Sequence, residues 1–220
     1  MQIKLEKPDA ILFDLDGTLA DTYSDLALAV NKMESKRGLS LTPSIKLRSV
    51  ASSGAKGILK IALNIDSTNE NYLKFRDEFL RNYNKNICVK TKLFDGIKDV
   101  LDTINKKKIK WGIVTNKLTK YTHALLPKIS LSHADCIVCG DTTKFPKPSP
   151  EPLFEAVKNL NLSSNKCWYI GDDLRDIQAG KAAKMLTFVA GWGYCSDKKI
   201  NDWEADHILK TPRDLISFIS

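Results

Sequence analysis

The chain has 220 residues, of which 43% are hydrophobic and 27% charged, and its formal net charge at pH 7 is +8. This length allows one full hydrophobic core and a smaller second unit. The absence of self-similarity at a fixed period argues against a repeat array, and the ordinary composition argues against a long disordered linker. Because no apolar run reaches membrane-spanning length and the N-terminus does not resemble a signal peptide, we expect a cytoplasmic protein without a membrane partner.

The positive charge and the five cysteines further limit the classes of protein to which the chain can belong. A basic protein can bind nucleic acid, but the lysines here are dispersed, and the run Lys106 to Lys108 has no interleaved aromatic residues on which bases could stack. We therefore expect no nucleic-acid partner and a positive surface that attracts an anionic substrate. An odd number of cysteines predicts a reducing compartment and no disulfide framework. The assembly is left open between monomer and homodimer.

Short apolar runs recur along the chain and alternate with helical patterns. This alternation is typical of βαβ units and predicts an α/β fold with a doubly wound parallel sheet. Amphipathic segments over 97–104, 150–160 and 176–183 have the length of crossover helices. The predicted strands are Ala10–Phe13, Trp111–Thr115, Cys136–Val138, Trp168–Ile170 and Leu186–Val189.

The stretch over residues 21–90 breaks this alternation. It has helix-period apolar spacing but no convincing strand, and Leu26, Val30 and Met33 share one helical face. Thr42 followed by Pro43 is typical of an N-cap with proline at the first helical position. We therefore predict a core domain formed by residues 1–20 and 91–220, into which residues 21–90 insert an all-helical cap domain.

The strongest chemical signal is a pair of carboxylates directly after the first predicted strand. Asp14 and Asp16 lie two residues apart, and Gly17 and Thr18 supply a tight turn and a hydroxyl after them. Carboxylates at the end of a buried strand are desolvated and repel each other unless a cation or a phosphoryl group compensates them. The pair therefore indicates chemistry rather than packing.

A second acidic cluster follows the strand over 168–170. Asp172, Asp173 and Asp176 would meet the first cluster, because the carboxyl ends of parallel strands converge where open α/β sheets bind ligands. Their hard oxygens suit Mg²⁺, which takes a few carboxylates, waters and a substrate phosphate. Either cluster alone could instead consist of helix N-caps and turn residues; the two together favour a metal site.

Polar groups also follow the strand over 111–115 and precede the helix over 150–160. Thr115 and Asn116 supply a hydroxyl and an amide suited to phosphoryl oxygens, and Lys147 offers an ammonium in a proline-rich loop. Each is weak alone, since such residues usually lie in turns or on solvated surface. Their order along the chain makes a joint signal.

With these motifs in place, the chain resembles the haloacid dehalogenase superfamily of phosphatases over nearly its whole length. The resemblance implies a Rossmann-like core, a cap, and a small phosphorylated metabolite as the partner. It also implies Asp14 as the nucleophile, Asp16 as the general acid and then base, Thr115 and Asn116 as phosphate-binding residues, and Lys147 as the catalytic cation.

The same resemblance implies a Mg²⁺ cofactor. The metal would be held by the Asp14 carboxylate, the backbone carbonyl of Asp16 and Asp172, with Asp173 and Asp176 in support. Asp16 also separates the chain from related dehalogenases and ion-pump ATPases, which usually have another residue there. A carboxylate nucleophile divides hydrolysis into two easier displacements, and the cations offset the charge on the transferred group.

Substrate recognition is expected in the cap. Ser53, Gly54 and Lys56 lead into a helix, where backbone N–H groups and an ammonium could bind a carboxylate; a simple serine N-cap is the alternative. Within the superfamily the chain resembles the phosphoglycolate phosphatase group and, more narrowly, N-acetylmuramic acid 6-phosphate phosphatases. The segments that carry this resemblance are 37–39, 53–55, 92–96, 111–117 and 171–177.

Other readings stay open at this point. A phosphosugar mutase keeps the same two aspartates but returns the phosphoryl group to its substrate, and a non-catalytic binding module could use the same scaffold. Cys136 and Cys139 match the spacing of a redox or zinc pair, but on a strand they would face opposite sides, so we expect buried structural cysteines. Trp192 and Tyr194 could flank the pocket or only pack.

Overall fold

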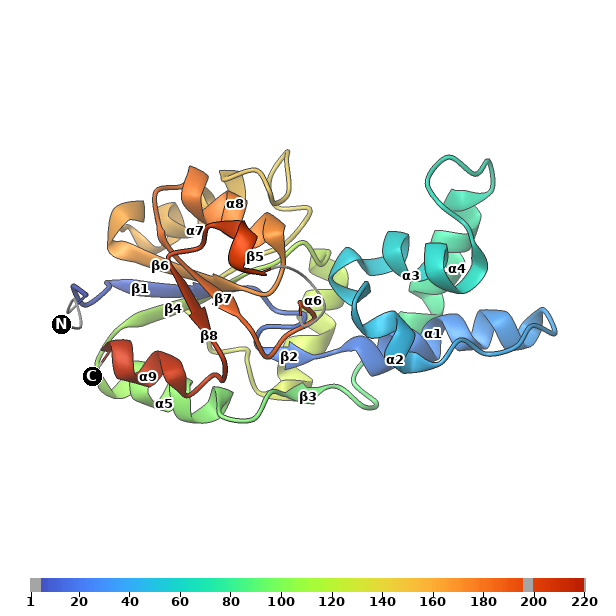
Figure 1. Ribbon diagram of the computed structural model, residues 1–220, viewed down its shortest axis with the longest axis horizontal. Coiled ribbons are helices and arrows are strands. Elements are labelled where there is room, and N and C mark those ends of the chain that lie inside the picture. The colour runs from blue at the N-terminus through green and yellow to red at the C-terminus, as the bar shows by residue number, and fades with distance from the viewer. Residues whose placement is uncertain (1–4, 196–199, 220) are drawn as a thin grey trace.

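The computed structural model describes residues 5–195 and 200–219. Figure 1 shows a sheet with helices on both faces and, beyond one end of its strands, a separate group of helices. The six-stranded sheet has the order β5-β4-β1-β6-β7-β8, and all its neighbouring strands run parallel. This confirms the predicted α/β fold. The strands are β1 (Ala10–Phe13), β4 (Lys110–Val114), β5 (Cys136–Val138), β6 (Cys167–Gly171), β7 (Leu186–Ala190) and β8 (His207–Leu209).

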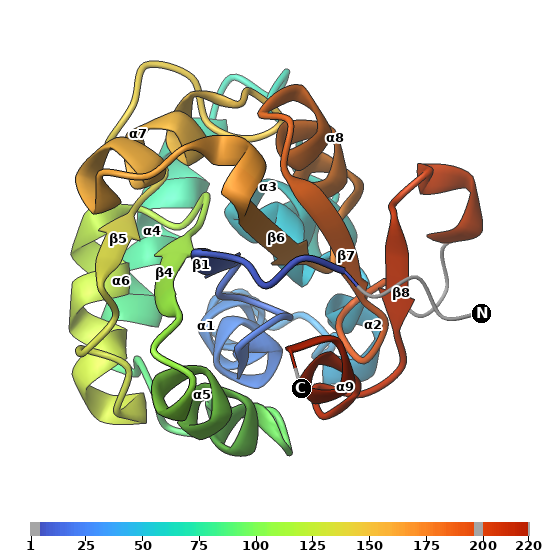
Figure 2. The same cartoon turned by 90° about the vertical axis from the view of Figure 1, so that its left-hand side faces the viewer.

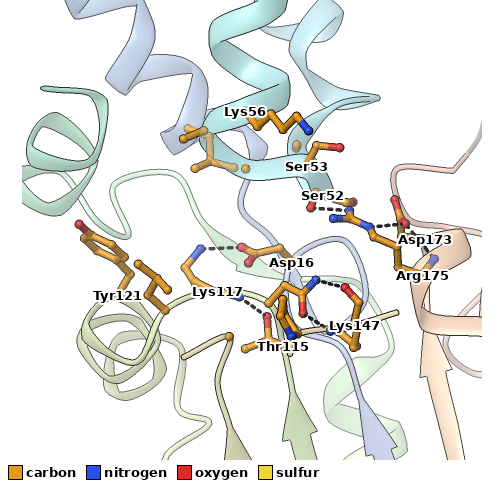
Figure 3. A pocket seen from close by; sticks show the side chains of 18 of the residues that line it. Asp16, Ser52, Ser53, Lys56, Thr115, Lys117, Tyr121, Lys147, Asp173 and Arg175 are labelled. Carbon is orange, nitrogen blue, oxygen red and sulfur yellow. Dashed lines mark hydrogen bonds and ion pairs between the residues drawn. The ribbon is translucent and has the colours of Figure 1, made fainter. Parts of the chain in front are cut away.

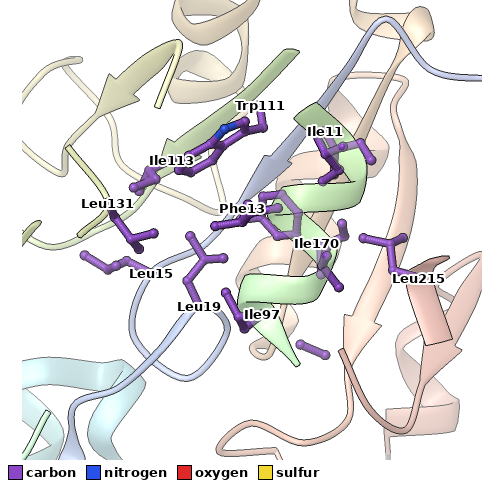
Figure 4. Close-up of a cluster of buried hydrophobic side chains, with 14 of the residues drawn as sticks. Ile11, Phe13, Leu15, Leu19, Ile97, Trp111, Ile113, Leu131, Ile170 and Leu215 are labelled. Carbon is purple, nitrogen blue, oxygen red and sulfur yellow. The ribbon is translucent and has the colours of Figure 1, made fainter. Parts of the chain in front are cut away.

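The central strand is apolar throughout because both of its faces are covered. Ile11 and Phe13 face one cluster, which includes Trp111 and Ile113 of β4 and is drawn in Figure 4. Ala10 and Leu12 face a second cluster on the other side. A buried parallel strand therefore appears in the sequence as a continuous apolar run rather than an alternating one.

Helices cover the two faces of the sheet, as the view along the strands in Figure 2 shows. The first cluster is closed by α5 (Ile97–Lys106), α6 (Thr119–Leu125) and α9 (Asp214–Ile219), and the second by α7 (Glu151–Leu160) and α8 (Leu174–Ala182). The predicted crossover helices are confirmed, with α8 beginning two residues earlier than expected. Short 3₁₀ turns over 51–53, 126–129, 164–166 and 200–203 complete the described elements.

The inserted helical region is also confirmed. It contains α1 (Tyr23–Lys36), α2 (Ser44–Arg48), α3 (Gly54–Leu63) and α4 (Tyr72–Lys85), which share a hydrophobic cluster of their own. At its base the two chain crossings pair as short antiparallel strands, β2 (Ala20–Asp21) and β3 (Lys92–Leu93). We call this region the cap; its exact boundaries as a domain stay a prediction.

The predicted cap of α2 is wrong in detail. The helix begins at Ser44, Pro43 lies at the N-cap, and the side chain of Thr42 makes no capping bond. Instead the Thr42 hydroxyl and backbone N–H donate to the buried carboxylate of Glu34 in α1, at 2.5 and 2.9 Å. A buried carboxylate needs such donors, so Glu34 takes the hydroxyl that would otherwise cap the helix.

Three strands, β2, β3 and β8, were not predicted because they are short and only partly buried, and the short helices α6 and α9 were not predicted either. Over the residues that the structure describes, no helix is both long and apolar enough to cross a lipid bilayer.

Candidate active site

A cavity of about 420 Å³ lies between the carboxyl end of the sheet and the cap, and residues of both line it. The chain proceeds from β1 to β4 on one side and later returns to β6 on the other, so the strand order reverses at β1. Open α/β sheets bind ligands at such a point. Figure 3 shows the cavity from close by, with cap residues above and core residues below.

Lys147 connects the two acidic motifs at the floor of the cavity. Its ammonium donates to Asp14 Oδ1 at 2.8 Å and to Asp176 Oδ1 at 2.7 Å, and it lies 2.7 Å from the Tyr169 hydroxyl and 2.9 Å from the Val114 carbonyl. The Lys147 side chain is 3% exposed. A lysine is buried this deeply only where anionic partners compensate its desolvation.

Asn116 holds Lys147 in place. Its Oδ1 accepts the backbone N–H of Lys147 at 3.0 Å, and its Nδ2 donates to the Lys147 carbonyl at 2.9 Å. Both ends of the amide are thus used on the backbone of the lysine loop. Asn116 thus positions the lysine loop while it lines the cavity, and its predicted contact with phosphate stays a prediction.

Asp14, Asp172 and Asp176 form one acidic cluster, as predicted from the convergence of strand ends. One carboxylate oxygen from each lies within 4.8 Å of the others, and all three residues are buried. Gly17 leaves the space for this arrangement, because a Cβ there would lie 2.2 Å from Asp172 Oδ2 and its φ is +92°.

Asp172 receives its hydrogen bonds from several parts of the chain. It accepts bonds from the Thr18 hydroxyl at 3.1 Å, from the Tyr194 N–H at 2.8 Å and from the Ser52 hydroxyl of the cap at 3.2 Å. Three donors around a fully buried carboxylate fix its orientation, and one of them comes from the cap.

Burial and repulsion from neighbouring carboxylates disfavour the charged forms of Asp14 and Asp172. Burial, followed by repulsion from Asp14 and Asp176, raises the pKa of Asp172 well above its usual value. Burial also raises the pKa of Asp14 to about 6, although Lys147 opposes the shift. Burial likewise disfavours the charged form of Lys147, yet Asp14 and Asp176 outweigh it and raise its pKa.

One ammonium faces three buried carboxylates, and hard carboxylate oxygens are the ligands that Mg²⁺ takes in proteins. The residues present therefore fit a divalent cation.

Asp16 lies apart from this cluster. Its Oδ1 accepts bonds from the Thr22 hydroxyl at 2.5 Å and from the ammonium of Lys117 at 2.8 Å, and it lines the cavity beneath the cap. Within the described residues the Asp16 carboxylate makes no hydrogen bond to the acidic cluster, and its role in proton transfer stays a prediction.

Sequence reasoning did not assign Lys117 a role. Burial disfavours its charge, but Asp16 and Tyr83 outweigh this effect and raise the pKa of Lys117. A lysine just after a strand usually lies on solvated surface, and its burial here depends on the cap above it.

The remaining core residues fall at or beside the site. Thr115 lines the cavity, and its hydroxyl oxygen accepts the Lys117 N–H at 3.2 Å. Asp173 is the N-cap of α8, where its carboxylate accepts the Arg175 N–H while the Asp173 N–H donates to Asp176. The capping interpretation is therefore correct for Asp173, and Asp176 combines the cap with its ion pair to Lys147.

Ser53, Gly54 and Lys56 all line the cap side of the cavity. The Ser53 hydroxyl makes no capping hydrogen bond, so the simple N-cap alternative is not what the structure shows. Its neighbour Ser52 approaches the core, where its carbonyl accepts a bond from Arg175 Nη2 at 2.8 Å. This contact could not be predicted, because its partners are far apart in the sequence.

The other residues considered in the sequence have packing roles. The Tyr194 hydroxyl accepts bonds from the Thr22 and Tyr23 N–H groups at 2.7 and 3.0 Å, and Trp192 Nε1 donates to the Thr18 carbonyl at 2.9 Å. Cys136 and Cys139 are buried, as expected, and burial raises the pKa of both thiols.

Comparison with known proteins shows consistent similarity. Residues 11–190 match the family described as haloacid dehalogenase-like hydrolase. The chain is 36% identical to an N-acetylmuramic acid 6-phosphate phosphatase of Pseudomonas putida over 208 residues, covering 94% of this chain and 93% of the relative. It is also 36% identical to a phosphoglycolate phosphatase of Xanthomonas campestris over 211 residues, covering 94% and 95%.

A similar fold occurs in a crystal structure described as a predicted phosphoglycolate phosphatase of Haemophilus somnus. The TM-score is 0.87 at 23% identity, over 98% of this chain and 100% of that one.

Proposed function

Because the chain belongs to the haloacid dehalogenase-like hydrolase family, we propose that it is a Mg²⁺-dependent phosphatase that hydrolyses a small phosphomonoester through a phosphoryl intermediate on Asp14. One observation carries this proposal. Asp14 lies at the end of β1 beside a cavity, held by Lys147 and clustered with Asp172 and Asp176. This arrangement combines a nucleophile, a cation and donors for a divalent metal.

In the first step, an Asp14 carboxylate oxygen attacks phosphorus and the bond between phosphorus and the leaving oxygen breaks. Asp16 gives its proton to that leaving oxygen, so that an alcohol departs. The ammonium of Lys147 offsets charge on the transferred group, and the Thr115 hydroxyl is placed to donate to one of its oxygens.

In the second step, Asp16 takes a proton from water while the water oxygen attacks phosphorus. The bond between phosphorus and Asp14 breaks, which releases phosphate and returns both aspartates to their starting states. Mg²⁺, held by Asp14, Asp172 and the Asp16 carbonyl with Asp176 beside them, would offset negative charge on the phosphoryl oxygens.

We expect phosphate release from p-nitrophenyl phosphate to require Mg²⁺ and to stop in excess EDTA. Mg²⁺ should also stabilise the folded protein, by about 2.7 kcal/mol at a concentration a hundredfold above its Kd. Asp172→Asn should lose most of this stabilisation because it removes a ligand, whereas Asp102→Asn, an exposed change on α5, should keep it. Thermal unfolding with and without Mg²⁺ measures both effects.

The same assay separates the competing functions. A mutase would transfer the phosphoryl group back to a sugar phosphate and release little free phosphate, and a binding module would release none. Full activity in EDTA, or an equal Mg²⁺ response in Asp172→Asn, would contradict the metal assignment.

For the substrate, we propose a phosphomonoester that also carries a carboxylate. The cap side of the cavity, across from Asp16, is lined by Ser53, Gly54 and Lys56. Within the described residues, the Ser53 hydroxyl forms no capping hydrogen bond with the helix that follows it. The two relatives are named for N-acetylmuramic acid 6-phosphate and phosphoglycolate, and both of these compounds carry a carboxylate. The cavity volume lies within the usual range for small-molecule sites.

Lys56→Ala should lower kcat/KM about tenfold for the acidic substrates and leave that for glucose 6-phosphate nearly unchanged, because only the former lose a charge-assisted hydrogen bond. Lys60→Ala, on the same helix but paired with Asp66 outside the cavity, is the matched control. Equal wild-type rates on glucose 6-phosphate, or equal losses on all substrates, would exclude recognition of the carboxylate at Lys56.

A further inference from the structure

Lys117 connects the proposed acid/base to the cap. It follows Asn116 at the exit of β4, and its ammonium lies 2.8 Å from Asp16 Oδ1, with the two side chains only 7% and 14% exposed. Its backbone N–H also donates to the Thr115 hydroxyl at 3.2 Å. One residue thus contacts both the proton-transfer group and the phosphate-binding hydroxyl (Figure 3).

In the part of the chain that the structure describes, the hydrogen bonds that the Asp16 side chain accepts involve only one of its two carboxylate oxygens. Among the described residues, both hydrogen bonds that its carboxylate accepts, from Thr22 and from Lys117, go to Oδ1. Two donors on one oxygen fix the plane of the carboxylate, and Oδ2 is left to exchange a proton with a reacting oxygen. A general acid must be held within hydrogen-bond reach of that oxygen, so this orientation bears directly on rate.

The support for Lys117 comes from the other side of the cavity. Its ammonium lies 4.8 Å from the ring centroid of Tyr83 in α4, which is a cation–π distance. Tyr83 is 2% exposed and packs against Tyr121 of the core, with ring centroids 6.0 Å apart.

The Tyr83 hydroxyl is buried, and within the described residues no group forms a well-aligned hydrogen bond with it, although it acts on the charge of the Lys117 ammonium. The contact of Tyr83 with Lys117 at a defined distance is the cation–π contact of its ring.

We propose that Lys117 is a positioning residue that orients Asp16 for proton transfer, and that Tyr83 keeps Lys117 in place from the cap. This rests on the proposed phosphatase function and adds to it, because the cap then takes part in completing the acid/base site as well as in recognising the substrate. With the cap raised, Lys117 would lose the Tyr83 ring and Asp16 its fixed plane.

The test compares two leaving groups. An alkoxide needs the proton from Asp16, whereas p-nitrophenolate leaves readily without one. Lys117→Met should therefore lower kcat/KM for phosphoglycolate about a hundredfold, within the range for general acid catalysis, and that for p-nitrophenyl phosphate less than about tenfold. Because kcat/KM reports the steps through the first phosphoryl transfer, slower hydrolysis of the intermediate does not obscure the comparison.

Four further variants make the test specific. Lys120→Met removes an exposed positive charge three residues away and should change neither substrate's kcat/KM by more than about twofold. Tyr83→Leu should lower the alkyl-to-aryl ratio in the same direction as Lys117→Met, and Tyr83→Phe should restore most of it because the ring remains. In an Asp16→Asn background, Lys117→Met should cause almost no additional loss of kcat/KM, since both changes remove the same function, proton transfer by Asp16.

Beryllium fluoride binding, as a mimic of the phosphoenzyme, verifies that each variant keeps a formed site. Equal losses on the two substrates, or losses that multiply with those of Asp16→Asn, would overturn the role of Lys117. If Lys117→Met does not fold, Tyr83→Leu and Lys117→Gln supply the same comparison. Failure of the wild type to release phosphate, or full activity of Asp14→Asn, would instead overturn the proposed function.

Discussion

Asp14→Asn is expected to lower phosphate release at least a hundredfold. The amide is a poor nucleophile and a poor metal ligand, and a hundredfold loss corresponds to just under 3 kcal/mol of activation free energy. The measurement is the steady-state kcat with p-nitrophenyl phosphate and phosphoglycolate at saturating Mg²⁺. Retention of more than about a hundredth of the wild-type kcat would show that Asp14 is not the nucleophile.

The same variant should stay folded. Asp14 is one of three buried carboxylates that repel each other, and the amide keeps the side-chain shape while removing one of these charges. Its oxygen can still accept the hydrogen bond from Lys147. Urea unfolding should therefore show a free energy close to that of the wild type, which separates loss of chemistry from loss of structure.

Lys147→Met is expected to abolish activity and also to destabilise the protein, by about 3 kcal/mol. The ammonium is the partner of two buried carboxylates, Asp14 and Asp176, and its removal leaves them uncompensated. Methionine has a similar length, so the loss reflects charge and hydrogen bonding more than volume. Urea unfolding in EDTA measures the stability without any contribution from bound Mg²⁺.

Lys158→Met is the matched control for this change, because Lys158 is 77% exposed and should alter the free energy of unfolding by less than about 0.5 kcal/mol. A Lys147→Met protein as stable as the wild type would mean that the buried carboxylates are protonated and need no partner. In that case the ion pairs seen here would contribute little to folding.

The strands were predictable where both faces of the sheet are buried. The strands β1, β4, β6 and β7 carry buried residues on both faces, so each appears as a mainly apolar run, interrupted in β7 by Thr187, and its bounds were found to within one residue. β8 has three residues, one of which is the 40% exposed Ile208, and this pattern does not differ from that of a loop.

The site was predictable where residues follow strands and less so where they depend on the cap. Asp14, Asp172 and Thr115 lie at strand ends that must converge in a parallel sheet, whatever the loops do. The contacts of Lys117 with Tyr83 and of Arg175 with Ser52 join segments far apart in the sequence. Nothing in local periodicity specifies such pairs.

The contacts of Asn116 with the lysine loop were not predicted for a related reason. An amide after a strand suits either a phosphate or a backbone, and the choice depends on which loop approaches it. Here the loop that carries Lys147 presents a backbone N–H and C=O to the two ends of the amide. The residues of the motif are the same whether the amide binds a phosphate or a backbone, so the sequence does not distinguish the two.

The ammonium of Lys147 has three protons, yet four oxygens lie within 2.9 Å of it. One acceptor is therefore always in excess. In the proposed mechanism the Asp14 carboxylate would lose its charge on bonding to phosphorus and become a weaker acceptor, and the proton directed at it would turn to the Val114 carbonyl or the Tyr169 hydroxyl. Asp14 would then be used and regenerated at each turnover without leaving a buried proton unbound, and little of the surrounding protein would have to rearrange.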